Sequence, residues 1–199
     1  MQILGVIDVG YAWKNGGADL VAMVTISGHP GSGTSTLVDG LCQHLHWNKI
    51  NGGQIFRDLA KEKGLTLEEF GQFCSEDEAV DKELDALLTQ TMLSGESPEI
   101  IESRLAGWWA FKNNIDCARI WIDVSEDIRA SRVVNREGGS HSEQLQLIRE
   151  RMDYDGARYL RYYAIDIDSH EPYTCVIQSD DLNAVEVLEL VLQHLEASA

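Results

Sequence analysis

Positive charge is scarce in this sequence. Lys and Arg number 16 against 33 Asp and Glu, which gives a formal net charge of −17 at pH 7. An acidic surface repels phosphate backbones and anionic lipids, so neither nucleic acid nor a membrane is expected as a main partner. Apolar runs are short as well, and none approaches the roughly 20 residues of a membrane span. No basic segment followed by an apolar core marks a signal peptide, so we expect a cytoplasmic protein.

Cysteine is also sparse, and its spacing argues against the common cysteine motifs. Cys42, Cys74, Cys117 and Cys175 lie far apart, with no CxxC pair. We therefore expect free thiols in a reducing compartment rather than a zinc site or a dithiol redox pair. Apolar content is ample, since 44% of the 199 residues are hydrophobic, which is enough for one domain with a substantial core.

The most informative stretch is 24–45, which reads VTISGHPGSGTSTLVDGLCQHL. A β-branched run is followed by a turn rich in Gly and Ser, and then by apolar residues at helical spacing. A strand, a glycine loop and a helix in this order are typical of a phosphate-binding loop. In such a loop, backbone N–H groups and the helix N-terminus converge on phosphate oxygens.

The loop from Gly28 to Ser35 fits the spacing GxxxxGK[ST] at every fixed position except one, because Thr34 stands where lysine is expected. Ser35 stands where a hydroxyl ligates the Mg²⁺ that bridges nucleotide phosphates. The missing lysine removes a positive charge from the phosphates, so another cation has to supply it. A glycine-rich turn that binds nothing is the alternative interpretation of the same residues.

Strand and helix patterns alternate along the rest of the chain. This alternation predicts a parallel sheet with helices on both faces. Residues 53–93 are interpreted as an all-helical insertion, with Thr66 as one N-cap and Ser75 or Asp77 as another. Residues 1–22 are treated as an appendage without an assigned role, although 3–9 could form a strand. The expected strands are 24–26, 99–102, 118–124 and 174–177, with 49–50 too short to assign alone; the later helices are 125–137, 141–163 and 182–195.

Arginine is concentrated in one span of this acidic chain, because seven of the ten arginines fall between Arg129 and Arg161. Surface ion pairs, worth under about 1 kcal/mol each, are one explanation. Phosphoryl transfer between two nucleotides is another, since it brings several phosphate charges together. Two unit charges 4 Å apart repel by about 4 kcal/mol at an effective dielectric of 20. Guanidinium groups and Mg²⁺ offset that repulsion.

Several motifs in order give the chain a specific likeness: GHPGSGTST, GGQIFRDLAKEKGLTLEEF, IIESRLAGW, IRASRVVNREGG, LIRERMDYDGARY and YYAIDIDS. With these motifs, residues 23–196 resemble the archaeal-type cytidylate kinases, a branch of the nucleoside monophosphate kinases in which threonine at the lysine position is tolerated. The resemblance implies an α/β, three-layer P-loop kinase fold with a mostly parallel five-stranded sheet. It also implies one domain over 23–199, with a helical insertion for the monophosphate at 53–93 and a lid at 129–163.

The resemblance also implies a role for individual residues. Arg132 and Arg136 match lid arginines that close over the transferring phosphoryl group, and Arg158 is counted with them as catalytic. Ser35 and, through water, Glu102 would organise the Mg²⁺. The residues implied to bind ATP are Gly28, His29, Pro30, Gly31, Ser32, Gly33, Thr34, Ser35 and Thr36; those implied to bind the acceptor are Arg57, Arg104, Arg151, Asp155 and Arg158, with Asp155 suited to ribose hydroxyls.

The expected reaction is the ATP-dependent phosphorylation of CMP and dCMP by a monomer. The base preference is the open point. In bacterial cytidylate kinases, the residue after the arginine that matches Arg104 is an aspartate that reads cytosine. Here that residue is Leu105, so base selectivity has to come from elsewhere. The candidate is the helical insertion around Asp77 to Asp85. The alternatives are a P-loop kinase of another nucleotide or metabolite, for which the region of Asp155 would supply a base, and a nucleotide-binding module without catalysis. Trp108 and Trp109 are expected in the core or the pocket wall rather than as a stacking platform. Asp166 and Asp168 are expected either in local loop contacts or in a functional role.

Overall fold

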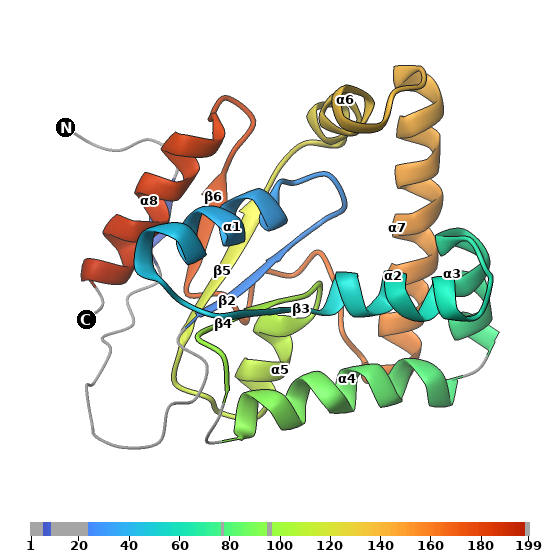
Figure 1. Ribbon diagram of the computed structural model, residues 1–199, viewed down its shortest axis with the longest axis horizontal. Helices are drawn as coiled ribbons and strands as arrows, with labels where there is room; N and C mark the ends of the chain where they lie inside the picture. Colours follow the sequence, from blue (N-terminus) through green and yellow to red (C-terminus); the bar gives the residue numbers. More distant parts are fainter. Residues whose placement is uncertain (1–5, 9–23, 77, 95–96, 198–199) are drawn as a thin grey trace.

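The computed structural model describes residues 6–8, 24–76, 78–94 and 97–197. Its centre is a sheet with the strand order β1-β6-β5-β2-β4-β3, and helices flank this sheet on both sides (Figure 1). The strands are β1 (Val6–Asp8), β2 (Val24–Gly28), β3 (Lys49–Asn51), β4 (Ile100–Glu102), β5 (Ala118–Asp123) and β6 (Cys175–Gln178). The helices are α1 (Thr34–Leu45), α2 (Gly52–Glu62), α3 (Leu67–Glu76), α4 (Glu78–Leu93), α5 (Ala106–Lys112), α6 (Glu126–Glu137), α7 (His141–Tyr163) and α8 (Ala184–Ala197).

Five of the strands, β3 to β6 with β2 at the centre, run parallel, as the sequence predicted. The sixth, β1, pairs antiparallel with β6 at the sheet edge, with Val6 opposite Ile177. β1 lies within residues 1–22, to which no role was assigned, so part of that segment extends the sheet. The rest of the segment lies outside the described residues.

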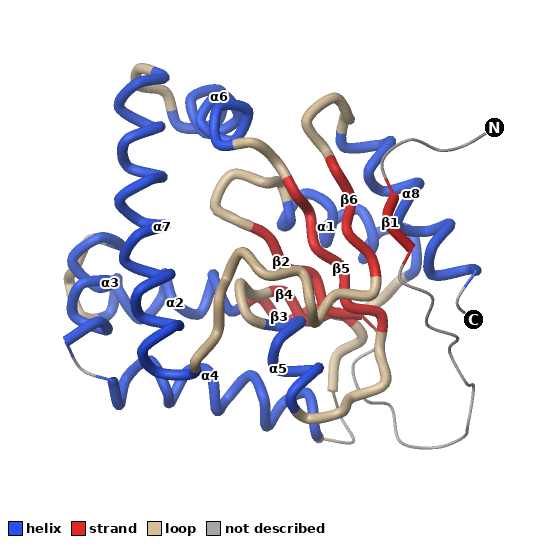
Figure 2. The backbone as a smooth tube through the Cα atoms, turned by 180° about the vertical axis from the view of Figure 1, so that it is seen from behind, coloured by secondary structure: helices blue, strands red, loops and turns tan. Residues whose placement is uncertain are grey.

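Apolar side chains cover both faces of the sheet, which gives the three layers that were predicted. On one face, alternate residues of the strands, such as Val24 and Ile26, pack against α1 and α8. On the other face, α5 lies against the sheet (Figure 2), and its buried side chains cluster with Ile101. Helix α5 was not predicted. It contains Trp108 and Trp109, which are buried as expected, at 6% and 8% exposure.

Helix starts follow the capping signals of the sequence. At α7, the Ser140 hydroxyl accepts a hydrogen bond from the Glu143 N–H, and the Ser140 N–H donates to the Glu143 carboxylate. Thr66 and Glu69 form the same reciprocal pair at α3, with distances of 3.1 and 2.8 Å. Such a capping box satisfies two backbone donors at a helix start. The predicted cap at Asp77 lies outside the described residues.

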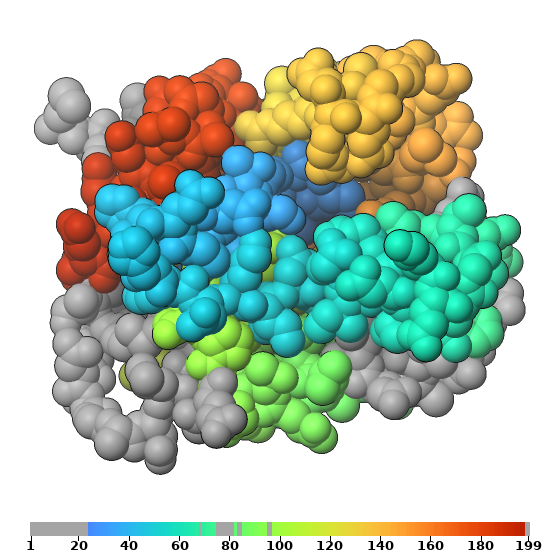
Figure 3. Space-filling view, viewed as in Figure 1, coloured from blue at the N-terminus to red at the C-terminus, as the bar shows by residue number. Residues whose placement is uncertain are grey.

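The helices between β3 and β4 form an arm beside the carboxyl ends of the parallel strands. This arm, α2 to α4, matches the predicted helical segment of 53–93, and α3 also contacts α7 through a hydrogen bond from the Tyr162 hydroxyl to the Cys74 carbonyl. Figure 3 shows a hollow between the arm and the helices α6 and α7, with the loop after β2 at its base. Among the helices of the described chain, none is both long and apolar enough to cross a membrane.

Candidate active site

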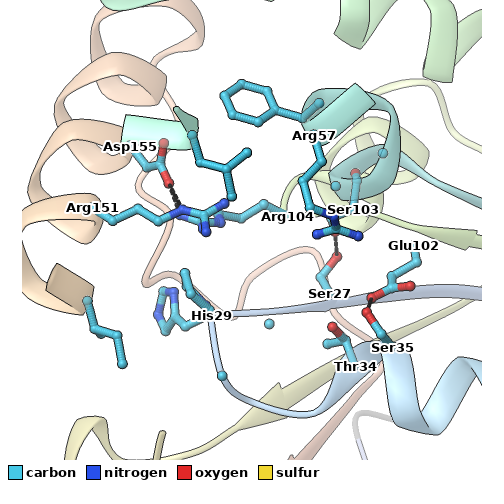
Figure 4. A pocket seen from close by; sticks show the side chains of 18 of the residues that line it. Ser27, His29, Thr34, Ser35, Arg57, Glu102, Ser103, Arg104, Arg151 and Asp155 are labelled. Atoms are coloured by element: carbon cyan, nitrogen blue, oxygen red, sulfur yellow. Dashed lines mark hydrogen bonds and ion pairs between the residues drawn. The ribbon is translucent and has the colours of Figure 1, made fainter. Parts of the chain in front are cut away.

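The hollow is a cleft of about 500 Å³ at the carboxyl ends of the strands. Its wall combines the loop after β2, the end of β4, the arm and α7, and Figure 4 shows side chains from these elements turned toward the same space. Segments far apart in the sequence therefore meet here. Clefts at this edge of open α/β sheets are common ligand sites.

The loop after β2 has the backbone that a phosphate cradle needs. Gly31 and Gly33 have φ angles of 85° and 93°, which L-residues with side chains rarely adopt. A Cβ at Gly31 would lie 2.9 Å from the Arg129 carbonyl oxygen, so the loop has no room for a side chain there. Helix α1 begins at Thr34, directly after the glycines, so its first N–H groups face the cleft. Eight of the nine loop residues predicted to bind ATP line the cleft: Gly28, His29, Pro30, Gly31, Gly33, Thr34, Ser35 and Thr36.

Ser35 and Glu102, the two residues predicted for Mg²⁺, lie next to each other. The Ser35 hydroxyl donates to the Glu102 carboxylate at 2.8 Å, and the Asn51 amide donates to the second carboxylate oxygen (Figure 4 shows the Ser35 contact). Burial raises the pKa of Glu102, and hydrogen bonds from Thr34 and Ser35 oppose that rise. A hydroxyl beside a carboxylate is a donor set that fits Mg²⁺, which uses one or two carboxylates together with phosphates and water.

Thr34, which stands at the lysine position, is near enough to Glu102 to help hold the pKa of that carboxyl down. Positive charge acts on Glu102 from two other elements, Lys49 of β3 and Arg57 of α2. Arg57 of α2 extends toward the loop in Figure 4, and its charge also acts on Glu102. Gln54 orients the Arg57 guanidinium by accepting at 2.8 and 3.2 Å.

The predicted acceptor residues on α7 gather around one carboxylate. Asp155 is 7% exposed and pairs with three arginines. Arg104 pairs with one of its oxygens, Arg158 Nη2 lies 2.9 Å from the other, and Arg151 Nε lies 3.7 Å away. Three guanidiniums against one carboxylate leave a net positive pocket, which suits an anion. Because arginines engage both Asp155 oxygens, a ribose contact by this residue stays a prediction.

Loss of solvation is the main effect that lowers the pKa of Arg151 to about 10, and repulsion by Arg104 adds to it. The neighbouring Asp155 opposes this shift. Arg151 therefore keeps its charge at neutral pH. Its side chain is 47% exposed, compared with 11% for Arg104 and 4% for Arg158, so it lies at the solvent side of the cluster.

The two arginines predicted for the lid lie differently. Arg136 lines the cleft, is mostly exposed and pairs with Glu137. Arg132 instead donates to backbone carbonyls of Ser32 and Ser179, at 2.8 and 2.6 Å, and braces the loop from behind. Arg129, to which no role was assigned, braces the same loop through the Pro30 carbonyl at 3.3 Å. The roles of Arg132 and Arg136 over a transferring phosphoryl group stay predictions.

His29 makes contacts that the sequence did not suggest. Its Nε2 lies 2.9 Å from an Asp168 carboxylate oxygen, and its ring meets the Trp121 ring edge-on at 4.9 Å. Burial, followed by the charges of Arg104 and Arg129, lowers the pKa of His29 to about 3. The ring is therefore neutral near pH 7. The expected local loop contact is made by the Asp166 carboxylate, which accepts a hydrogen bond from the Asp168 N–H at 3.0 Å, whereas the Asp168 carboxylate contacts His29.

Comparisons with known proteins show the family of this chain. The model of the cytidylate kinase-like family matches residues 23–181. A cytidylate kinase of Archaeoglobus fulgidus is 36% identical over 173 residues, covering 87% of this chain and 94% of the relative. A cytidylate kinase of Halobacterium salinarum is 38% identical over 175 residues, covering 88% and 90%.

Solved structures are alike in fold. A gluconokinase of Sinorhizobium meliloti superposes with a TM-score of 0.57 at 14% identity, covering 90% of this chain and 94% of that one. A shikimate kinase of Bacteroides thetaiotaomicron gives a TM-score of 0.55 at 15% identity, covering 89% and 99%. These identities support the fold alone, whereas the family model and the archaeal relatives extend over nearly the whole domain. The chain belongs to the cytidylate kinase-like family.

Proposed function

We propose that this protein transfers the γ-phosphoryl group of ATP to CMP and dCMP, forming ADP and the corresponding diphosphate. One observation carries the proposal: a glycine-rich phosphate cradle and a separate arginine cluster face each other across a single cleft. Two anion sites in one cleft suit a reaction that joins two phosphates in line. The archaeal relatives named cytidylate kinase support the choice of CMP.

The cradle is the proposed ATP side. Backbone N–H groups of the loop and of the first turn of α1 would hold the β- and γ-phosphates. Ser35 would hold Mg²⁺, and Glu102 would orient its water ligands. When bound, the ion neutralises charge on the transferring group. Arg57, which is predicted to bind the acceptor phosphate, is also the proposed source of the positive charge that Thr34 does not supply, because its side chain extends toward the loop.

The arginine cluster is the proposed acceptor side. Arg104, Arg151 and Arg158 would hold the phosphate of CMP, with Asp155 fixing their positions. No general base is required, because an acceptor phosphate is already ionised at neutral pH. A hydroxyl-bearing acceptor would need one, and Asp155, the candidate base, already has both oxygens paired with arginines. This pairing favours a phosphate acceptor over a hydroxyl acceptor.

We also propose that 23–199 is one catalytic domain in which the segments 53–93 and 129–163 close on the substrates. Closure would bring Arg136 over the transferring group and exclude water, which limits ATP hydrolysis. We propose that the protein acts as a monomer. We propose a cytoplasmic location for this activity.

The test is a coupled assay of ADP release with Mg-ATP and, in turn, CMP, dCMP, UMP and AMP. We expect turnover that CMP and dCMP stimulate most strongly. The variant Arg104→Gln should lose at least 100-fold in kcat/KM, whereas Arg149→Gln, which alters an exposed arginine of α7 paired with Glu126, should stay close to the wild type. Absence of acceptor-stimulated turnover with all four monophosphates would refute the proposal.

A further inference from the structure

One carboxylate of the arm has no part in the mechanism above. Asp85 of α4 lines the cleft. Its Oδ1 accepts a hydrogen bond from the Trp109 indole N–H at 3.1 Å, and its Oδ2 accepts one from the Tyr163 hydroxyl at 2.7 Å. The three residues come from α4, α5 and α7, so separate elements hold the carboxylate in one orientation.

Asp85 is a desolvated carboxylate held by two donors. Burial raises its pKa, and the hydrogen bonds from Tyr163 and Trp109, together with the charge of Arg158, oppose that rise. A desolvated carboxylate is destabilising unless its oxygens find donors. Each carboxylate has about four acceptor positions, and the two donors occupy only part of them. Asp85 can therefore accept further hydrogen bonds from a ligand in the cleft.

The surroundings of Asp85 suit the base of a nucleotide. Phe56, Leu88 and Tyr159 contribute ring and aliphatic surface to the same cleft, and small-molecule sites commonly combine such walls with a few fixed polar groups. Arg158 lies between Asp85 and the arginine cluster, because its charge acts on Asp85 and its guanidinium pairs with Asp155. A monophosphate whose phosphate lies on the arginines can thus direct its base toward Asp85.

We propose that Asp85 reads the base of the acceptor by accepting a hydrogen bond from the 4-amino group of cytosine. This inference rests on the proposed function and deepens it. Cytosine presents an amine donor at ring position 4, where uracil presents a carbonyl acceptor. A carboxylate attracts the first and repels the second. Asp85 therefore sets the preference for CMP over UMP, which the sequence left open when Leu105 replaced the aspartate of the bacterial enzymes.

The direct test is Asp85→Asn, which preserves the shape of the side chain. Trp109 can only donate, so the amide oxygen of the variant stays with Trp109, and the amide NH₂ turns to Tyr163, whose hydroxyl can accept. The second N–H of that amide is then able to donate to the 4-carbonyl of uracil. We expect kcat/KM for CMP to fall and that for UMP to rise, so that their ratio falls at least 10-fold.

Two controls separate base reading from a loss of structure. Asp153→Asn alters an exposed carboxylate of α7 and should leave the CMP-to-UMP ratio unchanged. Tyr163→Phe removes one donor to Asp85 and keeps the ring that packs against Trp109, so it should lower the ratio at least 3-fold even if Asp85→Asn does not fold. The ratio is informative because a merely structural effect would lower both activities together.

The outcomes distinguish this inference from the function on which it depends. If the wild type phosphorylates CMP and both Asp85→Asn and Tyr163→Phe keep the wild-type CMP-to-UMP ratio, the base-reading role is wrong and the kinase function stands. If the wild type phosphorylates no pyrimidine monophosphate, the proposed function fails, and the role of Asp85 fails with it. A ratio that falls in both variants supports the proposal.

Discussion

Replacing Asp155 by asparagine should destabilise the free protein strongly, because three cations depend on this carboxylate. Two of its partners, Arg104 and Arg158, are 11% and 4% exposed, so water does little to screen them. The neutral amide keeps the size of the side chain but removes the negative charge. The guanidiniums then repel one another in a region of low dielectric.

The magnitude follows from the burial of the cluster. An ion pair at 4 Å is worth about 4 kcal/mol at an effective dielectric of 20, before desolvation is subtracted. Removal of one partner from a buried pair typically costs about 3–5 kcal/mol, because an unpaired charge stays behind. Arg151 adds little, since its side chain is 47% exposed. We expect a loss of about 3 kcal/mol in the free energy of unfolding, and about 2–4 °C in Tm for each kcal/mol.

Urea unfolding and thermal melting of Asp155→Asn, with and without CMP, would measure this. Because the phosphate of CMP supplies the negative charge that the variant lacks, saturating CMP should restore at least half of the lost stability. Asp153→Asn, two residues earlier on α7 and exposed, is the matched control and should change stability by less than about 0.5 kcal/mol. A loss below 1 kcal/mol in Asp155→Asn, or an equal loss in the control, would show that the cluster is not held together by this charge.

Three further changes test the loop. Gly31→Ala should lose about 2–4 kcal/mol of stability, because φ is 85° and the new Cβ meets a carbonyl oxygen at 2.9 Å. Its control Gly64→Ala, at φ 69° with open space around it, should lose about 1 kcal/mol. Equal losses in urea unfolding would contradict this. Ser35→Ala should lower kcat about 100-fold and raise the Mg²⁺ concentration that activity requires. Ser35→Thr keeps a hydroxyl and should retain most activity in the same Mg²⁺ titrations. A full rate in Ser35→Ala would exclude a metal role for this residue. The pKa of His29, lowered from 6.5 to about 3, means that the unfolded chain binds an extra proton below pH 6.5, so stability falls as pH falls. Between pH 7.5 and 5.5, the free energy of unfolding of His29→Asn should therefore fall by about 1 kcal/mol less than that of the wild type, as measured by urea unfolding. Identical pH profiles for the two proteins would refute the lowered pKa of His29.

The features that sequence predicted well are those with local signals. The glycine spacing of the loop, the capping box at Ser140 and the β-branched strands all depend on residues close in the chain, so the parallel sheet and the long helix α7 were confirmed. Helix α5 was missed because its sequence, AGWWAFK, is buried almost all round and therefore lacks an amphipathic period.

The candidate site was only partly accessible to sequence reasoning, because its contacts join distant segments. The Asp85 carboxylate meets partners 24 and 78 residues away, and nothing local marks that meeting. Arg132 and Arg136 share a helix face by their spacing, yet Arg132 reaches the Ser179 carbonyl while Arg136 lines the cleft. Helical spacing gives the position of the Cα and Cβ atoms, but the long side chain of an arginine can place its guanidinium group on different partners.

The short strand β1 has a consequence for the solubility of the protein. Without it, β6 would present its backbone N–H and C=O groups along an open margin of the sheet, and such a margin can recruit a strand from another molecule. The antiparallel pairing of Val6–Asp8 with β6 occupies those groups. Because the family match begins at residue 23, this strand comes from a segment outside the matched region. β1 takes the place of β6 as the edge of the sheet, and its three residues offer few backbone groups to another molecule.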